Sequence, residues 1–130
     1  MRKIDKVYKP EIERVIEWLD SGLVSIKRSI LDEELAEAFG GICCYDVKDQ
    51  DYMIAITENQ PEYMRIDAYF HELWHLVNND FSKRDAVAIE IFAHRMEGRR
   101  FYGIFDNYEF ALLQYLEAAP VFDMTQYKAK

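Results

Sequence analysis

Three residues in a stretch of five could carry chemistry: His71, Glu72 and His75, within the sequence His-Glu-Leu-Trp-His. Residues four apart in a helix lie on one face, so both imidazoles can bind a single ion. Glu72 directly follows the first ligand, where its carboxylate can take a proton from a zinc-bound water. The HExxH pattern therefore predicts a zinc site with His71 and His75 as ligands and Glu72 as the catalytic base.

A catalytic zinc ion normally has three protein ligands, so one ligand must come from elsewhere in the chain. The candidates are Asp85, Glu90 and His94, on a helix expected after a short loop and antiparallel to the motif helix. We favour Glu90, because Ala86 and Ala93 share its face and small residues allow the helix to approach the metal. Asp85 is also suited to capping its own helix, and His94 could be a ligand or support one.

The motif is expected in the second half of a long helix. Asn59 begins a segment with an N-cap residue, a proline in the first turn and an acid at the third position, as many helices do. The helical pattern continues to about Val77 and ends at the polar residues 78–80. Its core-facing residues are expected to be Ile66, Phe70, Leu73 and Val77.

Residues 42–45 and 52–57 are apolar segments separated by the polar turn 46–51, which predicts a β-hairpin. The strand Tyr52–Thr57 is expected at an edge of the sheet, where it could pair with an extended substrate. Apolar periodicity predicts further helices at 10–19, 29–39, 83–99 and 108–118. Together these elements indicate an α+β fold, in which a short antiparallel sheet packs on the motif helix with flanking helices, in a single compact domain of residues 1–130.

Composition restricts the location and the partners of the chain. It has 130 residues, half of them hydrophobic, and a formal net charge of −8. This charge argues against direct nucleic-acid binding and against docking on an anionic membrane. No segment approaches the roughly 20 apolar residues of a membrane span, and no apolar run follows the charged N-terminus, so no signal peptide is expected.

Cys43 and Cys44 are adjacent and are the only cysteines of the chain. Neighbouring cysteines form poor disulfides, and in a strand their side chains point to opposite faces. We therefore expect buried structural thiols and a reducing, cytoplasmic location.

The segment from Met53 to about Met96 resembles the ImmA/IrrE family of zinc metallopeptidases. That family typically shows a strand, a polar turn with proline, a helix reading HELxH and then a helix with an E-x-x-A motif. The corresponding segments here read MIAITENQP, IDAYFHELWHL and EIFAHRM, and the preceding GICCYD strand also fits.

The resemblance implies a zincin-like domain of the gluzincin type, with His71, His75 and Glu90 binding zinc and Glu72 acting as the general base. It further implies cleavage of an intracellular helix-turn-helix repressor, often encoded beside the peptidase in a mobile element or stress operon. Trp74 stands where family members often have glycine. We interpret it as an aromatic core residue, with a wall of the substrate cleft as the alternative reading.

Two other functions remain open at this point. The chain could be a zinc-binding regulatory module or toxin–antitoxin component that binds a repressor-type partner without cutting it, or the motif could be a coincidence on a structural helix. A peptidase would also need a donor to the oxyanion, for which Tyr69, Tyr102 and Tyr108 are equal candidates. The sequence names neither the substrate nor the oligomeric state.

Overall fold

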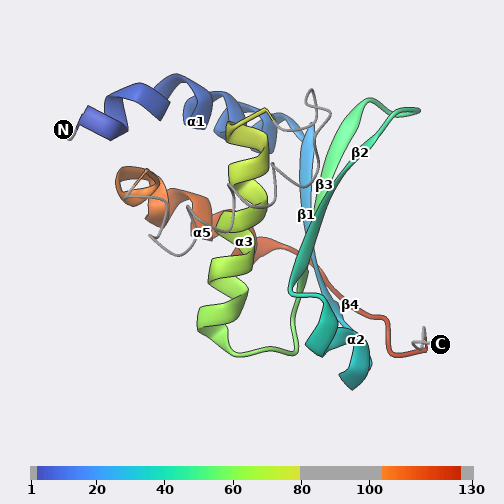
Figure 1. The fold of residues 1–130 in the computed structure, drawn as a ribbon. Helices are drawn as coiled ribbons and strands as arrows, with labels where there is room; N and C mark the ends of the chain where they lie inside the picture. Colours follow the sequence, from blue (N-terminus) through green and yellow to red (C-terminus); the bar gives the residue numbers. More distant parts are fainter. Residues whose placement is uncertain (1–2, 80–103, 127–130) are drawn as a thin grey trace.

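A computed structural model describes residues 3–79 and 104–126 of the chain. It has the expected α+β class, with the longer helices on one side of a four-stranded sheet (Figure 1). The helices are α1 (Lys3–Ser21), α2 (Glu33–Ala38), α3 (Glu62–Val77) and α5 (Glu109–Ala118), with a short 3₁₀ turn at Asp106–Tyr108. The strands are β1 (Val24–Ile30), β2 (Gly41–Asp46), β3 (Asp51–Thr57) and β4 (Val121–Asp123).

The sheet has the order β2-β3-β1-β4 and is mixed, whereas the sequence led us to expect an antiparallel one. The predicted hairpin is confirmed as β2 and β3, which pair antiparallel. β1 lies parallel to both β3 and β4, and neither β1 nor β4 was predicted. Parallel neighbours require crossover connections. The segment with α2 and β2 connects β1 to β3, and α5 leads the chain back to β4 beside β1.

Two helix predictions need correction. The helix expected at 29–39 is wrong in its first part, because Ser29 and Ile30 end strand β1. α2 begins only at Glu33, where the Asp32 carboxylate caps it by accepting from the amide of Leu35 (2.9 Å). The helix expected at 10–19 is longer, since α1 begins at Lys3 and contains Pro10.

Helix α3 ends as predicted but begins later. Asn59 does not cap it; its side chain instead bonds the amide and the carbonyl of Leu31 (3.0 and 2.8 Å), fastening the end of β1 to the loop before α3. After Val77 the chain turns at Asn79, whose φ of 54° ends the helical path. The predicted helix at 108–118 is confirmed as α5, and the helix predicted at 83–99 lies outside the described residues.

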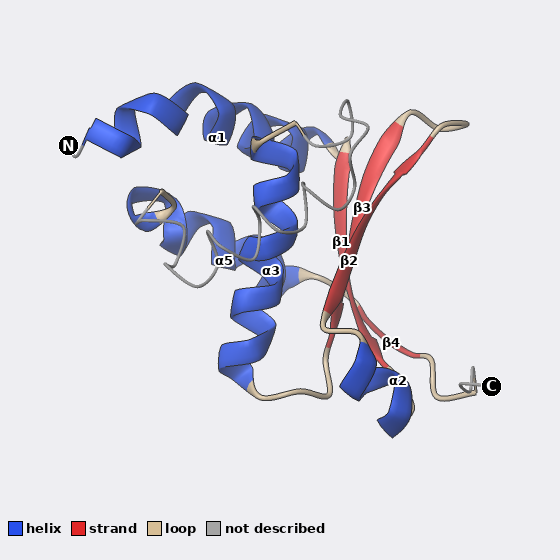
Figure 2. Ribbon diagram, viewed as in Figure 1, coloured by secondary structure: helices blue, strands red, loops and turns tan. Residues whose placement is uncertain are grey.

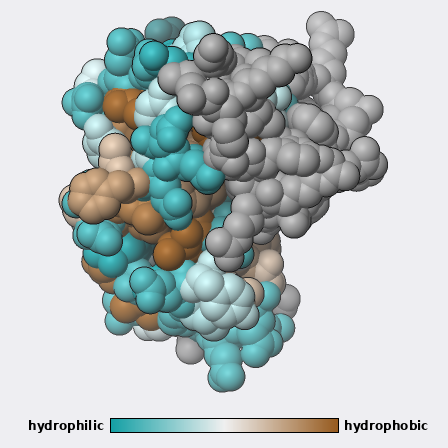
Figure 3. Space-filling model, turned by 90° about the vertical axis from the view of Figure 1, so that its left-hand side faces the viewer, coloured by the Kyte–Doolittle hydropathy of each residue, from teal (hydrophilic) through white to brown (hydrophobic). Residues whose placement is uncertain are grey.

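The hydrophobic core lies between the sheet and the helices α1, α3 and α5, all on the same side of the sheet (Figure 2). Its fully buried residues include Ile12 and Val15 of α1, Ile54 and Ile56 of β3, Leu73 and Trp74 of α3, and Leu112 of α5. The outer surface of this helical side is largely hydrophilic with smaller hydrophobic areas (Figure 3).

None of the described helices is long and apolar enough to cross a membrane.

Gly41 allows β2 to approach α3 closely. A Cβ built at this position would lie 2.9 Å from Cδ1 of Ile56, 3.3 Å from the carbonyl oxygen of Ala55 and 3.5 Å from Cβ of Ala68. Ala68 precedes His71 by one turn of α3. The missing side chain at Gly41 therefore sets the distance between the edge of the sheet and the motif helix.

We expect Gly41→Ala to lower the free energy of unfolding by about 1–3 kcal/mol, because the new Cβ would overlap Cδ1 of the fully buried Ile56 and force that side chain to shift. Gly40→Ala is the matched control. Its Cβ would meet no atom closer than 3.4 Å, so its effect should stay within about 0.5 kcal/mol. Urea denaturation of the two variants measures the difference. Equal stability would show that β2 and α3 are less tightly packed than described.

Candidate metal centre

The second half of α3 is buried on every side. Its buried residues run without interruption from Tyr69 to Val77. Apolar side chains account for most of this segment, but His71, Glu72 and His75 are also only 8%, 7% and 7% exposed. Imidazole nitrogens and a carboxylate are also groups that bind zinc and its reacting water in zinc enzymes.

The two imidazoles converge as the spacing predicts. The Nε2 atoms of His71 and His75 lie 3.2 Å apart, and the ring centroids are separated by 4.8 Å at an interplanar angle of 81°. Two nitrogen ligands at about 2.0–2.1 Å from a tetrahedral zinc are themselves about 3.3 Å apart. The two nitrogens therefore stand at the separation that a shared zinc ion requires.

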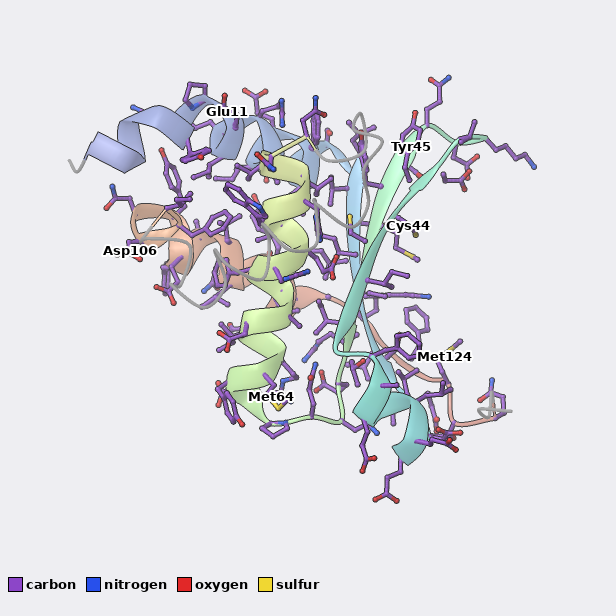
Figure 4. All side chains as sticks on the ribbon, viewed as in Figure 1. Glu11, Cys44, Tyr45, Met64, Asp106 and Met124 are labelled. Atoms are coloured by element: carbon purple, nitrogen blue, oxygen red, sulfur yellow. The ribbon has the colours of Figure 1, made fainter. Side chains whose placement is uncertain are left out.

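Strand β2 runs beside this motif and presents Cys43 to it. The pKa of the Cys43 thiol is raised, first by burial and then by the nearby Glu72 carboxylate, with a smaller effect of Cys44. Cys43 packs against the core, while Cys44 points to the side of the sheet away from α3 (Figure 4). The expectation that both thiols are buried is wrong for Cys44, which is exposed on the open face.

All three candidates for the third ligand, Asp85, Glu90 and His94, lie outside the described residues, so Glu90 remains a prediction. Within the described part of the chain, one group of potential ligands clusters with its oxygens within 4.8 Å: Asp46, Asp49 and Asp51. These carboxylates belong to the exposed hairpin turn, separate from the HExxH motif, and exposed acidic groups are common without an ion.

Trp74 is a core residue, as interpreted from the sequence. It is completely buried and meets the ring of Tyr8 edge-on at 5.4 Å, on the side of α3 that faces α1. It therefore faces α1 in the core.

The tyrosines proposed as oxyanion donors are placed differently. The hydroxyl of Tyr69 donates to the carbonyl of Leu112 (2.6 Å), and burial raises the pKa of Tyr69, so this side chain holds α5 against α3. Tyr108 donates to the carboxylate of Glu13 on α1 (3.5 Å). Tyr102 lies outside the described residues.

The prediction that Tyr52–Thr57 lies at the edge of the sheet is wrong. Tyr52–Thr57 is strand β3, which lies inside the sheet between β2 and β1. In the part of the chain that the structure describes, the edge strand beside the motif is β2 instead. The error follows from the missed strand β1, although its alternation of Val24 and Ile26 with polar residues carried a signal of period two.

The chain matches no protein-family model, and no curated protein or solved structure matches it. The functional argument therefore depends on the residues and on their geometry.

The two cysteines should differ strongly in reactivity. The thiolate is the reactive form, and the pKa of the partly buried Cys43 is raised, so iodoacetamide should modify the exposed Cys44 at least roughly ten times faster in the native protein. Peptide mass spectrometry after timed labelling measures both rates, and unfolding in denaturant should remove the difference. Equal rates in the native protein would contradict the burial of Cys43 against the core.

Proposed function

We propose that the protein is a zinc-dependent endopeptidase. The observation that carries the proposal is the pair of Nε2 atoms of His71 and His75, 3.2 Å apart on a buried helix face. Glu72 directly follows His71 in the sequence and is also buried, and its carboxylate acts on the thiol of Cys43 in β2. The resemblance to the ImmA/IrrE family supports the same assignment and supplies Glu90 as the third ligand.

A zinc ion at this site would polarise a peptide carbonyl and lower the pKa of a water molecule. The protein contributes the remaining chemistry through Glu72, whose carboxylate takes a proton from the water and passes it to the leaving amine. Burial of Glu72 strengthens these interactions, because a low-dielectric surrounding screens charge less than water does.

The substrate is proposed to be a protein segment in extended conformation. The open edge of β2 offers backbone groups for pairing beside the motif, a common mode of peptide capture. The family resemblance suggests an intracellular regulator such as a helix-turn-helix repressor. The net charge of −8 suits a basic partner of that kind.

Zinc content tests the metal site directly. We expect about one zinc ion per chain in tag-free protein, as in other sites with three protein ligands. His71→Ala and His75→Ala should lose the ion. Among the three candidates for the third ligand, Glu90→Gln should weaken zinc binding by more than about 100-fold. Asp85→Asn and His94→Ala should weaken zinc binding by less than about 100-fold, the range of a residue that only supports a ligand. Metal analysis after dialysis, and titration against a chelator, measure both quantities. Protein that takes up no zinc after reconstitution would overturn the proposal.

Cleavage is tested separately from metal binding with Glu72→Gln. This variant should keep its zinc and lose cleavage of a repressor encoded beside the protein by about 10²–10⁴-fold, since the general base is removed while the ligands stay. Glu62→Gln is the matched control, because Glu62 lies in the exposed first turn of the same helix; it should cleave normally. Mass spectrometry of the fragments gives the rate. A repressor that binds wild-type protein and is never cut would indicate a regulatory module instead.

A further inference from the structure

Among the described residues, no strand pairs with the outer edge of β2. Within residues 3–79 and 104–126, β3 is the only strand that pairs with β2. Residues of an antiparallel pair alternate between those bonded to the neighbouring strand and those whose backbone groups point away. The amide of Thr57 donates to the carbonyl of Gly40 (3.0 Å). Gly40 therefore faces β3, and every second residue after it does the same. The backbone groups of Gly41, Cys43 and Tyr45, which lie between them, point to the outer edge.

This edge runs alongside the HExxH motif. Gly41 lies against Ala68, one turn before His71. Further along β2, Cys43 lies within electrostatic reach of Glu72. A peptide paired with β2 would therefore extend along the strand that flanks the motif helix.

Tyr45 supplies an aromatic surface on the same face as Cys43, two residues further along the strand. Tyr45 is 41% exposed, and its ring packs on the ring of Tyr52 with the centroids 4.8 Å apart. Tyr52 in turn stacks on Trp18 of α1 (5.4 Å, interplanar angle 11°). Because this row of rings is already held in place, Tyr45 suits a cross-strand partner that is aromatic or β-branched.

The next residue along β2 begins an acidic turn. Oxygens of Asp46, Asp49 and Asp51 lie within 4.8 Å of one another, and repulsion, chiefly from Asp46, raises the pKa of Asp49. Lys48 is the one basic residue of this turn, so negative charge remains in excess. The ion pairs found in the described ranges involve other residues. A cationic side chain opposite Asp46 would be attracted by all three carboxylates.

The open face of the same strand is apolar before this turn. Ile42 is 56% exposed, and Cys44 is exposed on the same face as Asp46. Side chains directly opposite each other on paired strands share a face, so a partner strand would meet apolar residues here and an acid at the end.

We propose that the edge of β2 binds an extended peptide segment antiparallel to itself, with a basic side chain opposite Asp46, an aromatic or β-branched one opposite Tyr45 and an apolar one opposite Cys44. The antiparallel direction places the basic residue three positions N-terminal to the residue opposite Cys43. This inference rests on the proposed peptidase function and defines the substrate class of that site.

Binding of short peptides tests this register without catalysis. The probe is a fluorescein-labelled peptide Arg-Tyr-Val-Ala-Ile-Thr with a Gly-Ser spacer. Its comparisons are the same peptide with Glu in place of Arg and the reversed sequence Thr-Ile-Ala-Val-Tyr-Arg. Fluorescence anisotropy with the zinc-loaded Glu72→Gln protein gives the affinities with the peptide intact. We expect the Arg probe to bind roughly tenfold more tightly than either comparison, and the advantage over the Glu peptide to shrink as salt rises.

Charge-neutral variants assign the preference to the turn. Asp46→Asn combined with Asp49→Asn should reduce the advantage of the Arg peptide to about twofold or less. The matched control combines Glu33→Gln with Glu34→Gln, two acids of the first turn of α2, and should leave the advantage unchanged. Cys43→Pro removes an amide that points to the open edge and should weaken all binding, while Cys43→Ala should not.

Three results would overturn the inference. These are equal affinity for the Arg and Glu peptides, equal affinity for the forward and reversed peptides, and a preference that survives the Asp46 and Asp49 substitutions. A stable dimer in sedimentation that Cys43→Pro dissociates would show that a second copy occupies the edge, which also overturns it. Zinc content and repressor cleavage are measured independently, so the proposed peptidase function stands or falls by itself.

Discussion

Burial of three polar side chains in the core-facing part of α3 is the constraint on which the remaining structure depends. His71, Glu72 and His75 are almost as inaccessible as the apolar residues between them. Removing such groups from water costs several kcal/mol unless they gain partners (about 2–7 kcal/mol for an uncompensated neutral group). The two imidazoles partly satisfy each other through their Nε2 contact. The surrounding core must supply the free energy that keeps them there, and it does so with α1, α5 and β3 packed around the same helix.

The orientation of α3 against the sheet is fixed at two places. Near its start, Arg65 reaches the carboxylate and the carbonyl of Glu58, and Arg28 of β1 reaches the same carboxylate. These ion pairs are about a quarter exposed and contribute little free energy each, but they join the helix to the central strand. One turn before the motif, the contact of Gly41 with Ala68 brings the edge strand alongside. Both contacts precede the motif on α3, and together they hold the face that carries His71 and His75 beside the sheet.

The sequence pattern was sufficient to predict those helices and strands that depend on residues close together in the chain. The hairpin of β2 and β3, the end of α3 and the extent of α5 all follow from apolar periodicity and from polar or proline stops. The spacing of His71 and His75 likewise predicts their convergence, because it depends on helix geometry alone. What the sequence could not show depends on contacts between distant residues. β4 has only three residues and exists because it pairs with β1, and the alternation of β1 is interrupted at Arg28, whose guanidinium bonds the carbonyl of Ala119 (3.0 Å).

The position of β1 also has a consequence for how the protein is made. Its backbone pairs on one side with β3 and on the other with β4, and Arg28 finds its carbonyl partner 91 residues further along the chain. While the ribosome is still synthesising the segment before Val121, the nascent chain can form the hairpin and dock β1 on β3, but the other side of β1 has no strand to pair with. Closing so long a loop adds only a modest entropic cost, yet it must wait for translation to reach β4. For that interval the backbone groups of Arg28 to Ile30 on this side of β1 lack the strand that pairs with them in the finished fold.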